Sequence, residues 1–310
     1  MEVSKRLRPI TKEEAIQSFK DLSALPCADI GKQSRMGLPC LDYFFLHHRI
    51  KAKTKRHISF YEALKDKDIL AYVNSKVESV KGVYAGDVTE DEFLRKRYDI
   101  FQLYYGTINQ FRPTEAKRLY CTLAPKKGVL DFSAGWGGRC LGAMAYGVPY
   151  IGIDANVHMK PTYERMIKTL EPATKVTMKF QPSETVDFST FTYDLVFTSP
   201  PYFTLEEYEN MPEYGSKEGF LDKFFRPVVL NAWKHLDRSG HMALNMPKEM
   251  YDAVKGILPK VWKRIQMPIA NRHPTDAVAG RAIGEKNSKA RSETIYVWKK
   301  AGSTTRKVKK

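Results

Sequence analysis

The stretch that first indicates the fold is Leu130-Asp131-Phe132-Ser133-Ala134-Gly135-Trp136-Gly137-Gly138-Arg139. It starts as a short apolar strand, passes through a glycine-rich turn and opens a helix that Gly147 ends. This order is typical of the place where a doubly wound sheet binds a cofactor. A dinucleotide fingerprint would need a glycine where this chain has Cys140, which disfavours a bound diphosphate. A tight turn with no ligand is the alternative.

Apolar strands and amphipathic helices alternate along the chain after this stretch. Further strands are expected at 150–154, 175–180, 193–198, 241–245, 262–269 and 294–298, and helices at 139–146, 161–170 and 220–236. Such alternation predicts an α/β fold with a doubly wound, mostly parallel, Rossmann-like sheet.

The region before the sheet reads as mainly helical. Thr11 with Glu14 forms a capping box for a helix within residues 1–24, Thr89 starts a helix over 89–105, and Pro113 opens another. Residues 25–60 are expected to be irregular because glycine and proline recur there. We therefore divide the chain into an N-terminal basic, mainly helical region (1–105), an α/β domain (106–300) and a flexible basic tail (301–310).

The composition is that of a globular protein: 43% of the 310 residues are hydrophobic and 28% are charged. No run of about 18 apolar residues is present, so no membrane span is expected. The N-terminus is charged, without the apolar core of a signal peptide. Four cysteines are too few for a disulfide scaffold and indicate a reducing compartment. We expect a soluble, intracellular protein, located in the cytoplasm or wherever its substrate resides.

The net charge of +16 is concentrated at the two ends of the chain. Residues 1–60 hold 12 Lys and Arg against 6 Asp and Glu, and residues 261–310 hold 13 against 3, whereas residues 61–260 hold 26 of each. A neutral body with basic ends favours a polyanionic partner such as nucleic acid. The alternative is that the basic ends only keep the chain in solution.

Two further positions carry chemistry. Asp154 ends the second expected strand, 23 residues after Asp131, where an acid can accept hydrogen bonds from the hydroxyls of a ribose. Thr198-Ser199-Pro200-Pro201-Tyr202-Phe203 follows the strand at 193–198. Two prolines here fix a rigid turn that presents a hydroxyl, a carbonyl and an aromatic face, which suits a planar ring bearing an amino group. A helix cap and a proline-rich strand exit are the respective structural alternatives.

These motifs in this order resemble those of the DNA amino-methyltransferases, the S-adenosylmethionine-dependent enzymes that methylate N4 of cytosine or N6 of adenine. The resemblance covers roughly residues 109–203 and implies that residues 106–300 form a methyltransferase domain. It implies S-adenosyl-L-methionine as cofactor, duplex DNA with the target base flipped out as partner, and RNA as a possible partner. The N-terminal hundred residues match no family, and the oligomeric state is not indicated.

The resemblance also implies which residues form the site. Ser199, Pro200, Pro201 and Tyr202 would be catalytic. The cofactor would be bound by Phe111, Arg112, Pro113, Asp131, Ser133, Ala134, Gly135, Gly137, Asp154, Ala155 and Glu184. The chain departs from the family at Ser133, where a phenylalanine is usual, and Glu184 only approximates the acid that meets the adenine ring. Ser199 in place of Asp or Asn slightly favours N4 of cytosine.

Nucleic acid would be contacted by two basic clusters. The first is Arg49, Lys51, Lys53, Lys55 and Arg56, with Tyr43, Phe44 and Phe45 nearby; the second is Arg272, Arg281, Lys286, Lys289 and Arg291. Basic residues mixed with aromatic residues suit phosphate contacts and base stacking. An equally supported alternative is that the aromatic residues of the first cluster are core and its basic residues a solvated face.

No metal site is expected. Cys27, Cys40, His47 and His48 include zinc-ligand types but lack a Cys-x-x-Cys element. Three alternatives to DNA methylation stay open: the same chemistry on RNA, the same chemistry on a protein glutamine, and a non-catalytic nucleic-acid-binding subunit that keeps the methyltransferase fold. An Asn-Pro-Pro-Tyr turn is used on glutamine, so Ser199 counts against a protein substrate.

Overall fold

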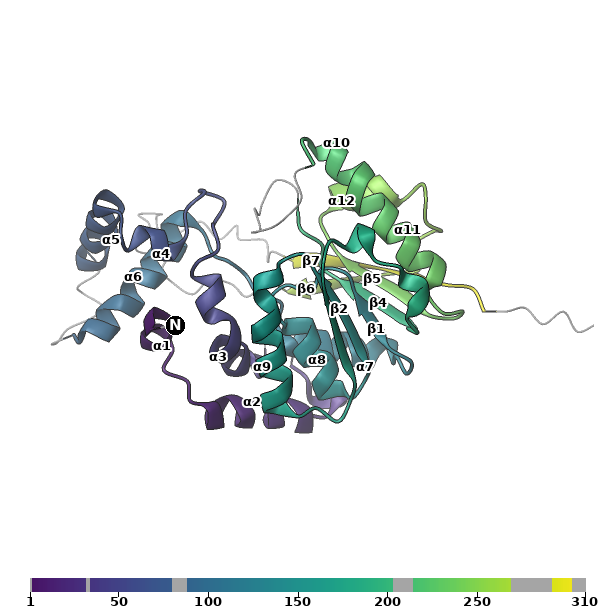
Figure 1. Ribbon diagram of the computed structural model, residues 1–310, viewed down its shortest axis with the longest axis horizontal. Coiled ribbons are helices and arrows are strands. Elements are labelled where there is room, and N and C mark those ends of the chain that lie inside the picture. The colour runs from purple at the N-terminus through teal and green to yellow at the C-terminus, as the bar shows by residue number, and fades with distance from the viewer. Residues whose placement is uncertain (1, 32–33, 80–87, 203–213, 269–291, 303–310) are drawn as a thin grey trace, which may run out of the picture.

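The computed structural model describes residues 2–31, 34–79, 88–202, 214–268 and 292–302 (Figure 1). Its strands are β1 (Val129–Asp131), β2 (Tyr150–Asp154), β3 (Val176–Phe180), β4 (Leu195–Thr198), β5 (His241–Asn245), β6 (Lys263–Pro268) and β7 (Ser292–Lys299). Its α-helices are α1 (Glu2–Leu7), α2 (Lys12–Ala24), α3 (Leu38–Arg49), α4 (Phe60–Ala63), α5 (Lys67–Ser79), α6 (Glu90–Tyr105), α7 (Pro113–Leu123), α8 (Gly138–Tyr146), α9 (Lys160–Leu170), α10 (Lys217–Phe220), α11 (Arg226–His235) and α12 (Lys248–Val254). A π-helical turn, Leu221–Phe225, joins α10 to α11 in one helical stretch.

The seven strands form one sheet in the order β3-β2-β1-β4-β5-β7-β6. Neighbouring strands from β3 to β5 run parallel, and β7 is antiparallel to both β5 and β6. The order reverses between β1 and β4, which is the switch point where open α/β sheets bind ligands at the carboxyl ends of their strands. This arrangement confirms the predicted doubly wound, mostly parallel, Rossmann-like sheet.

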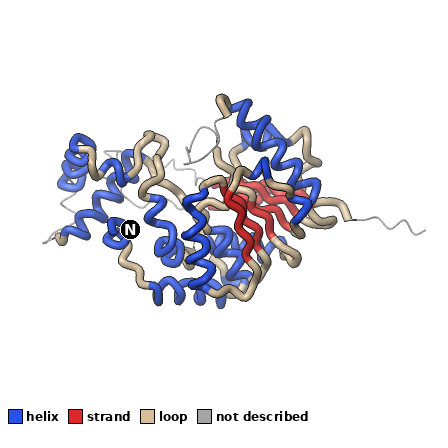
Figure 2. The backbone as a smooth tube through the Cα atoms, viewed as in Figure 1, coloured by secondary structure: helices blue, strands red, loops and turns tan. Residues whose placement is uncertain are grey.

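Helices cover both faces of the sheet, as Figure 2 shows in blue on either side of the red strands. One face is packed by α2, α3, α7, α8 and α9, with Phe45, Tyr120 and Tyr163 in its core. The other face is packed by α10 to α12, with Phe132, Phe225 and Trp298 in its core. Burial on both faces explains why β1 and β4 each begin with consecutive apolar residues, Val129-Leu130 and Leu195-Val196-Phe197, instead of alternating apolar and polar residues.

The N-terminal region contributes to the core of the sheet and also forms a smaller cluster of its own. Phe19 and Leu22 of α2 and Phe44 of α3 belong to the core on the sheet. Leu7, Leu46, Phe60 and Phe101 join α1, α3, α4 and α6 in the separate cluster. The capping box predicted at Thr11 is present, and Thr89, predicted to start a helix, caps α6 with a capping box to Glu92.

The expectation that residues 25–60 are irregular was wrong for 38–49, which form helix α3. Gly37 caps this helix with φ +79°, a left-handed conformation that glycine adopts without strain. Pro39 lies in its first turn, where proline is tolerated because that N–H needs no helical partner. The same residues that suggest a loop therefore also start a helix.

The cysteines behave differently from the expectation of reduced thiols. Cys27 and Cys121 form a disulfide between the segment after α2 and helix α7, with 5.7 Å between their Cα atoms. Cys40 and Cys140 are free and buried. Close to the disulfide, the Lys117 ammonium donates to the carbonyls of Leu22 (2.7 Å), Ser23 (2.9 Å) and Leu25 (2.7 Å), which holds the end of α2 on α7. Among the described residues, no helix combines the length and the apolar character needed to cross a membrane.

Candidate active site

The glycine-rich turn after β1 is held in a fixed shape from several sides. Gly135 and Gly137 have φ of +59° and +76°, which only glycine adopts readily. A Cβ at Gly138 would lie 1.9 Å from the Phe111 carbonyl oxygen, so the chain at 111 packs directly on the turn. The Tyr163 hydroxyl donates to the Gly135 carbonyl at 2.9 Å. The turn is therefore rigid and keeps its backbone at the carboxyl end of β1.

Asp131 lies beneath this turn and has protein partners for both of its carboxylate oxygens. It is 0% exposed; its Oδ2 accepts from Arg139 Nε (2.7 Å) and the Tyr150 hydroxyl (2.6 Å), and its Oδ1 accepts from Arg139 Nη2 (3.3 Å). Arg139 also donates to the Ser133 carbonyl, which links the pair to the turn. Burial alone would lower the pKa of the Arg139 guanidinium, but the Asp131 carboxylate raises it above its ordinary value. The geometry thus gives Asp131 a structural role behind the predicted cofactor loop.

Asp154 lies beside the turn and accepts hydrogen bonds from two backbone amides. Gly135 N donates to Oδ2 at 2.7 Å and Asn156 N donates to Oδ1 at 2.9 Å. Burial raises the pKa of Asp154 to about 6, although the two amides partly oppose this by stabilising the charged form. Each carboxylate oxygen has a second lone pair, so Asp154 can still accept from a ligand. Ala155 follows at the same end of β2.

The segment ahead of α7, which holds the predicted cofactor ligands Phe111, Arg112 and Pro113, adjoins the glycine-rich turn. The Phe111 ring lies 5.4 Å from the Phe197 ring and 5.4 Å from the Arg139 guanidinium. Arg112 lies 3.7 Å from Glu115, and Pro113 is buried at the start of α7. These contacts join the segment, the glycine turn and β4 in one packed unit.

Glu184 lies in the short turn after β3 and carries one unused acceptor. Its Oε1 accepts from the Tyr214 hydroxyl at 2.9 Å, whereas its Oε2 is buried with no hydrogen-bond partner in the described part of the chain. The neighbouring Ser183 hydroxyl donates to the Phe132 carbonyl at 2.6 Å, which anchors this turn to the end of β1. Glu184 is therefore held near the glycine turn with an acceptor available for a ligand.

The Ser-Pro-Pro-Tyr turn leaves the sheet beside the glycine turn. Strands β1 and β4 are parallel neighbours, with Leu130 opposite Val196, so both turns start at the same edge. Ser199, Pro201 and Tyr202 are partly exposed and Pro200 is buried. The Ser199 Oγ lies 3.5 Å from the Tyr202 hydroxyl.

Two residues that the sequence motifs did not reveal, Asn245 and Glu293, are connected to the Ser-Pro-Pro-Tyr turn by hydrogen bonds. Asn245, at the end of β5, donates from Nδ2 to Ser199 Oγ (3.3 Å) and to Glu293 Oε2 of β7 (2.8 Å). The sequence carries one local signal for Asn245: it is a polar residue that ends the strand 241–245. This signal does not reveal that Ser199 and Glu293 are its hydrogen-bond partners.

The basic residues of the first cluster divide into one partly buried and four exposed side chains. Arg49 pairs with Asp42 and its side chain is 10% exposed, so its contact with phosphate stays a prediction. Lys51, Lys53, Lys55 and Arg56 are exposed on the loop between α3 and α4. Phe44 and Phe45 are core residues with 0% exposure, so the structural alternative was correct for them. Arg272, Arg281, Lys286, Lys289 and Arg291 lie outside the described residues.

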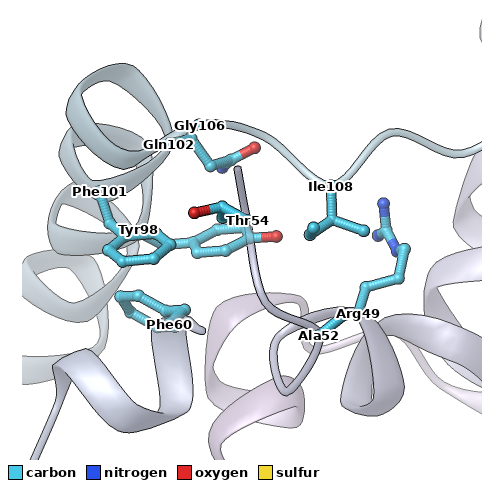
Figure 3. A pocket seen from close by; sticks show the side chains of 9 residues that line it. All are labelled: Arg49, Ala52, Thr54, Phe60, Tyr98, Phe101, Gln102, Gly106 and Ile108. Carbon is cyan, nitrogen blue, oxygen red and sulfur yellow. The ribbon is translucent and has the colours of Figure 1, made fainter. Parts of the chain in front are cut away.

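A cavity lies beside Arg49, between α6 and the loop after α3 (Figure 3). Phe60, Tyr98 and Phe101 form one side of it and Ile108 lies opposite. Its volume is about 10 Å³, room for about one water molecule, so it is too small for a nucleotide. No group of three His, Cys, Asp or Glu side chains that could hold a metal is found in the ranges that the structure describes.

Comparisons with known proteins give a likeness of architecture only. No protein-family model and no curated protein sequence matches the chain. Among solved structures, the tRNA m1G37 methyltransferase of M. jannaschii has a TM-score of 0.38 and 13% identity, over 61% of this chain and 49% of that one. TrmN from Thermus thermophilus has a TM-score of 0.42 and 14% identity, over 69% of each chain. An rRNA methylase from Streptococcus thermophilus has a TM-score of 0.41 and 9% identity, over 63% of this chain and 99% of that one.

The chain spans about half the length of the first of these proteins, and scores this low support no inference about substrate. The fold class rests instead on the observed strand order, with antiparallel β7 between β5 and β6.

Proposed function

We propose that the protein is an S-adenosylmethionine-dependent methyltransferase that acts on the exocyclic amine of a base in nucleic acid. The observation that carries the proposal is the juxtaposition of the Ser-Pro-Pro-Tyr turn with the glycine turn at the switch point of the sheet. Parallel strands β1, β2 and β4 bring both turns and Asp154 to one edge. The sequence resemblance to amino-methyltransferases rests on these same motifs.

The residues around the glycine turn fit the cofactor. Asp154 would accept hydrogen bonds from the ribose hydroxyls, and the unpartnered Oε2 of Glu184 would accept from the adenine side. A Cβ added at Gly135 would have the Ser133 carbonyl oxygen, at 3.9 Å, as its nearest neighbour beyond the adjoining residues, so a ligand can approach this backbone. Ser133, Ala134, Gly137, Phe111, Arg112 and Pro113 would line the rest of this site. Asp131 would act only through the shape of the turn.

The catalytic turn would activate the amine. When bound, S-adenosylmethionine supplies a methyl group, whose bond to sulfur breaks with the electron pair left on sulfur as the amine nitrogen bonds to the carbon. The nitrogen lone pair is delocalised into the base, so Ser199 Oγ and the Pro200 carbonyl would accept its N–H bonds and make it more nucleophilic. The methylated nitrogen, positively charged at that point, would then transfer one proton to solvent water. Tyr202 would stack on the base after it is flipped out.

The substrate proposed from the sequence is duplex DNA, with N4 of cytosine slightly favoured over N6 of adenine. RNA is the second candidate. Because the amines of cytosine and adenine occur in both polymers, RNA is a separate arm of the test.

The proposal is tested by incubating the full chain with methyl-labelled S-adenosylmethionine and, separately, duplex DNA, structured RNA and protein. Digestion and mass spectrometry identify the modified nucleoside. Label in an N4-methylcytosine or N6-methyladenine residue supports the proposal, and the polymer that carries it decides between DNA and RNA. Binding of nucleic acid without any methylated product would instead support the non-catalytic alternative.

The catalytic assignment predicts that Ser199→Ala slows methyl transfer about a hundredfold. The reason is that one acceptor for the developing charge on the amine is lost, which typically costs on the order of 3 kcal/mol in the transition state. Affinity for S-adenosylmethionine should change little because Ser199 faces the base. Single-turnover rates check this, with Ser189→Ala, an exposed serine of the turn at 188–190, as the matched control. Full activity in Ser199→Ala would remove Ser199 from the catalytic turn.

The role of Asp154 predicts that cofactor affinity falls in acid. Its pKa of about 6 means that the folded protein takes up a proton as the pH falls through 6, and the neutral form loses acceptor strength. Affinity for S-adenosylmethionine should therefore be constant above pH 7 and fall up to about tenfold per pH unit below 6. Calorimetric titrations from pH 5 to 8 measure this.

Asp154→Asn is the control, and it should bind the cofactor more weakly at pH 7.5 and without this pH dependence. Asp154 also makes the stability of the fold depend on pH, with a sign opposite to that of the cofactor affinity. Because its pKa is raised on folding, the native state is stabilised relative to the unfolded state at low pH, and this contribution is lost as the pH rises from about 4 through 6. An affinity that does not change with pH would exclude Asp154 from the ribose contact.

A further inference from the structure

The side chain of Asn245, on β5, contacts both the proposed catalytic turn after β4 and the neighbouring strand β7. It is 1% exposed, at the carboxyl end of β5, where β5 lies between β4 and β7. Its Nδ2 donates to Ser199 Oγ at 3.3 Å and to Glu293 Oε2 at 2.8 Å. The main-chain carbonyl of the same residue accepts from the Tyr202 hydroxyl at 3.4 Å. One residue thus contacts both polar side chains of the proposed catalytic turn.

The orientation of the Asn245 amide follows from Glu293. A carboxylate only accepts hydrogen bonds, so the amide must turn its NH2 group, not its oxygen, toward Glu293. This leaves Asn245 Oδ1 buried with no hydrogen-bond partner among the residues described. A buried acceptor without a partner normally costs stability. The amide keeps this orientation because it satisfies Glu293 and directs its two N–H bonds to the carboxylate and to Ser199.

We propose that Asn245, oriented by Glu293, is a positioning residue that fixes the direction of the Ser199 hydroxyl; this inference rests on the proposed function. With Asn245 donating to Ser199 Oγ, the hydroxyl proton of Ser199 is directed to the Tyr202 oxygen, 3.5 Å away. One lone pair of Ser199 Oγ then remains for an N–H of the target amine. Without Asn245 the hydroxyl rotates freely, and this lone pair is aimed at the amine only part of the time.

The test is a double-mutant cycle between Asn245 and Ser199. Asn245→Ala should slow single-turnover methyl transfer on the order of tenfold, in line with the loss of one hydrogen bond, and should leave the affinity for S-adenosylmethionine unchanged. In a Ser199→Ala background the same substitution should have no further effect, because residues that act through one another are not additive. A structural role predicts the same rate loss in both backgrounds, which would overturn the proposal.

Glu293→Gln is a second variant in case Asn245→Ala does not fold. Glutamine has the same shape but can donate to Asn245 Oδ1, so the amide of Asn245 is no longer held in one orientation. We expect a loss of about threefold to tenfold in rate with Ser199 present and none with Ser199→Ala. Unchanged turnover in Glu293→Gln would show that Glu293 does not orient the amide.

Asn231→Ala serves as the matched control, because this asparagine of α11 donates to the Val186 carbonyl, away from the catalytic turn. It should leave the rate unchanged, and melting temperatures of all variants identify any general loss of stability. The two hypotheses fail in different ways. A wild-type protein that methylates neither DNA nor RNA refutes the proposed function, whereas an active wild type with an equally fast Asn245→Ala refutes only the positioning role.

Discussion

Asp131→Ala should lower the free energy of unfolding by about 3–5 kcal/mol, the cost expected when one partner of a buried ion pair is removed. The substitution leaves the Arg139 guanidinium in a site where it is 5% exposed, without the carboxylate that now offsets its burial. It also removes the acceptor of the Tyr150 hydroxyl, which is itself fully buried. Chemical denaturation followed by circular dichroism measures the loss.

The matched control is Asp252→Ala. Asp252 pairs with Lys248 and Lys255, but its side chain is 34% exposed and solvent screens the pairs, so the loss of stability should be much smaller than for Asp131→Ala. The result also separates two roles for Asp131. If Asp131→Ala keeps the stability of the wild type and loses affinity for S-adenosylmethionine, Asp131 is a direct cofactor ligand, as the sequence resemblance implied, and the structural role is wrong.

Binding to nucleic acid should fall about a thousandfold between 50 and 200 mM salt if about six phosphates are neutralised. The expected cause is the release of counterions from the polyanion by the basic ends of the chain. Of the residues that the structure describes, Lys51, Lys53, Lys55 and Arg56 on the loop above α3 in Figure 1 are the exposed members of the first predicted cluster. Fluorescence anisotropy with a labelled duplex over a salt series measures the slope.

Replacing these four residues with alanine should reduce the salt slope by about four, since each phosphate contact contributes roughly one. The control replaces four other exposed lysines, Lys12 and Lys20 of α2, Lys126 before β1, and Lys168 in the last turn of α9. Equal slopes for the two variants would show that the loop contributes only general charge, and a flat response of the wild type would show that the basic ends serve solubility.

The sheet and its two turns follow from local sequence signals. The run from Val129 to Asp131, the glycines at 135 and 137 and the prolines at 200 and 201 each restrict the backbone within a few residues of themselves. Alternation of strands and helices then predicts a parallel sheet, because a crossover helix is the usual connection between parallel strands. The same signals name Asp154, at the end of β2, and Ser199, directly after β4, as candidates. Glu184 was named only through the resemblance to the amino-methyltransferases.

Partners that come from distant parts of the chain were decided only by the tertiary structure. Asp131 and Arg139 lie on either side of the glycine-rich turn in the sequence. Only the folded structure shows that the Asp131 carboxylate faces inward, where it accepts hydrogen bonds from Arg139 and from Tyr150 of β2. Likewise Phe44 and Phe45 fitted a nucleic-acid surface by sequence, whereas α3 packs both of them into the core. Asn245 is 46 residues from Ser199 and 48 from Glu293, and these three meet only because β5 lies between β4 and β7. Backbone preferences act over a few residues and can be read from the sequence, whereas the neighbours of a side chain depend on the order of strands in the sheet, which no local pattern specifies.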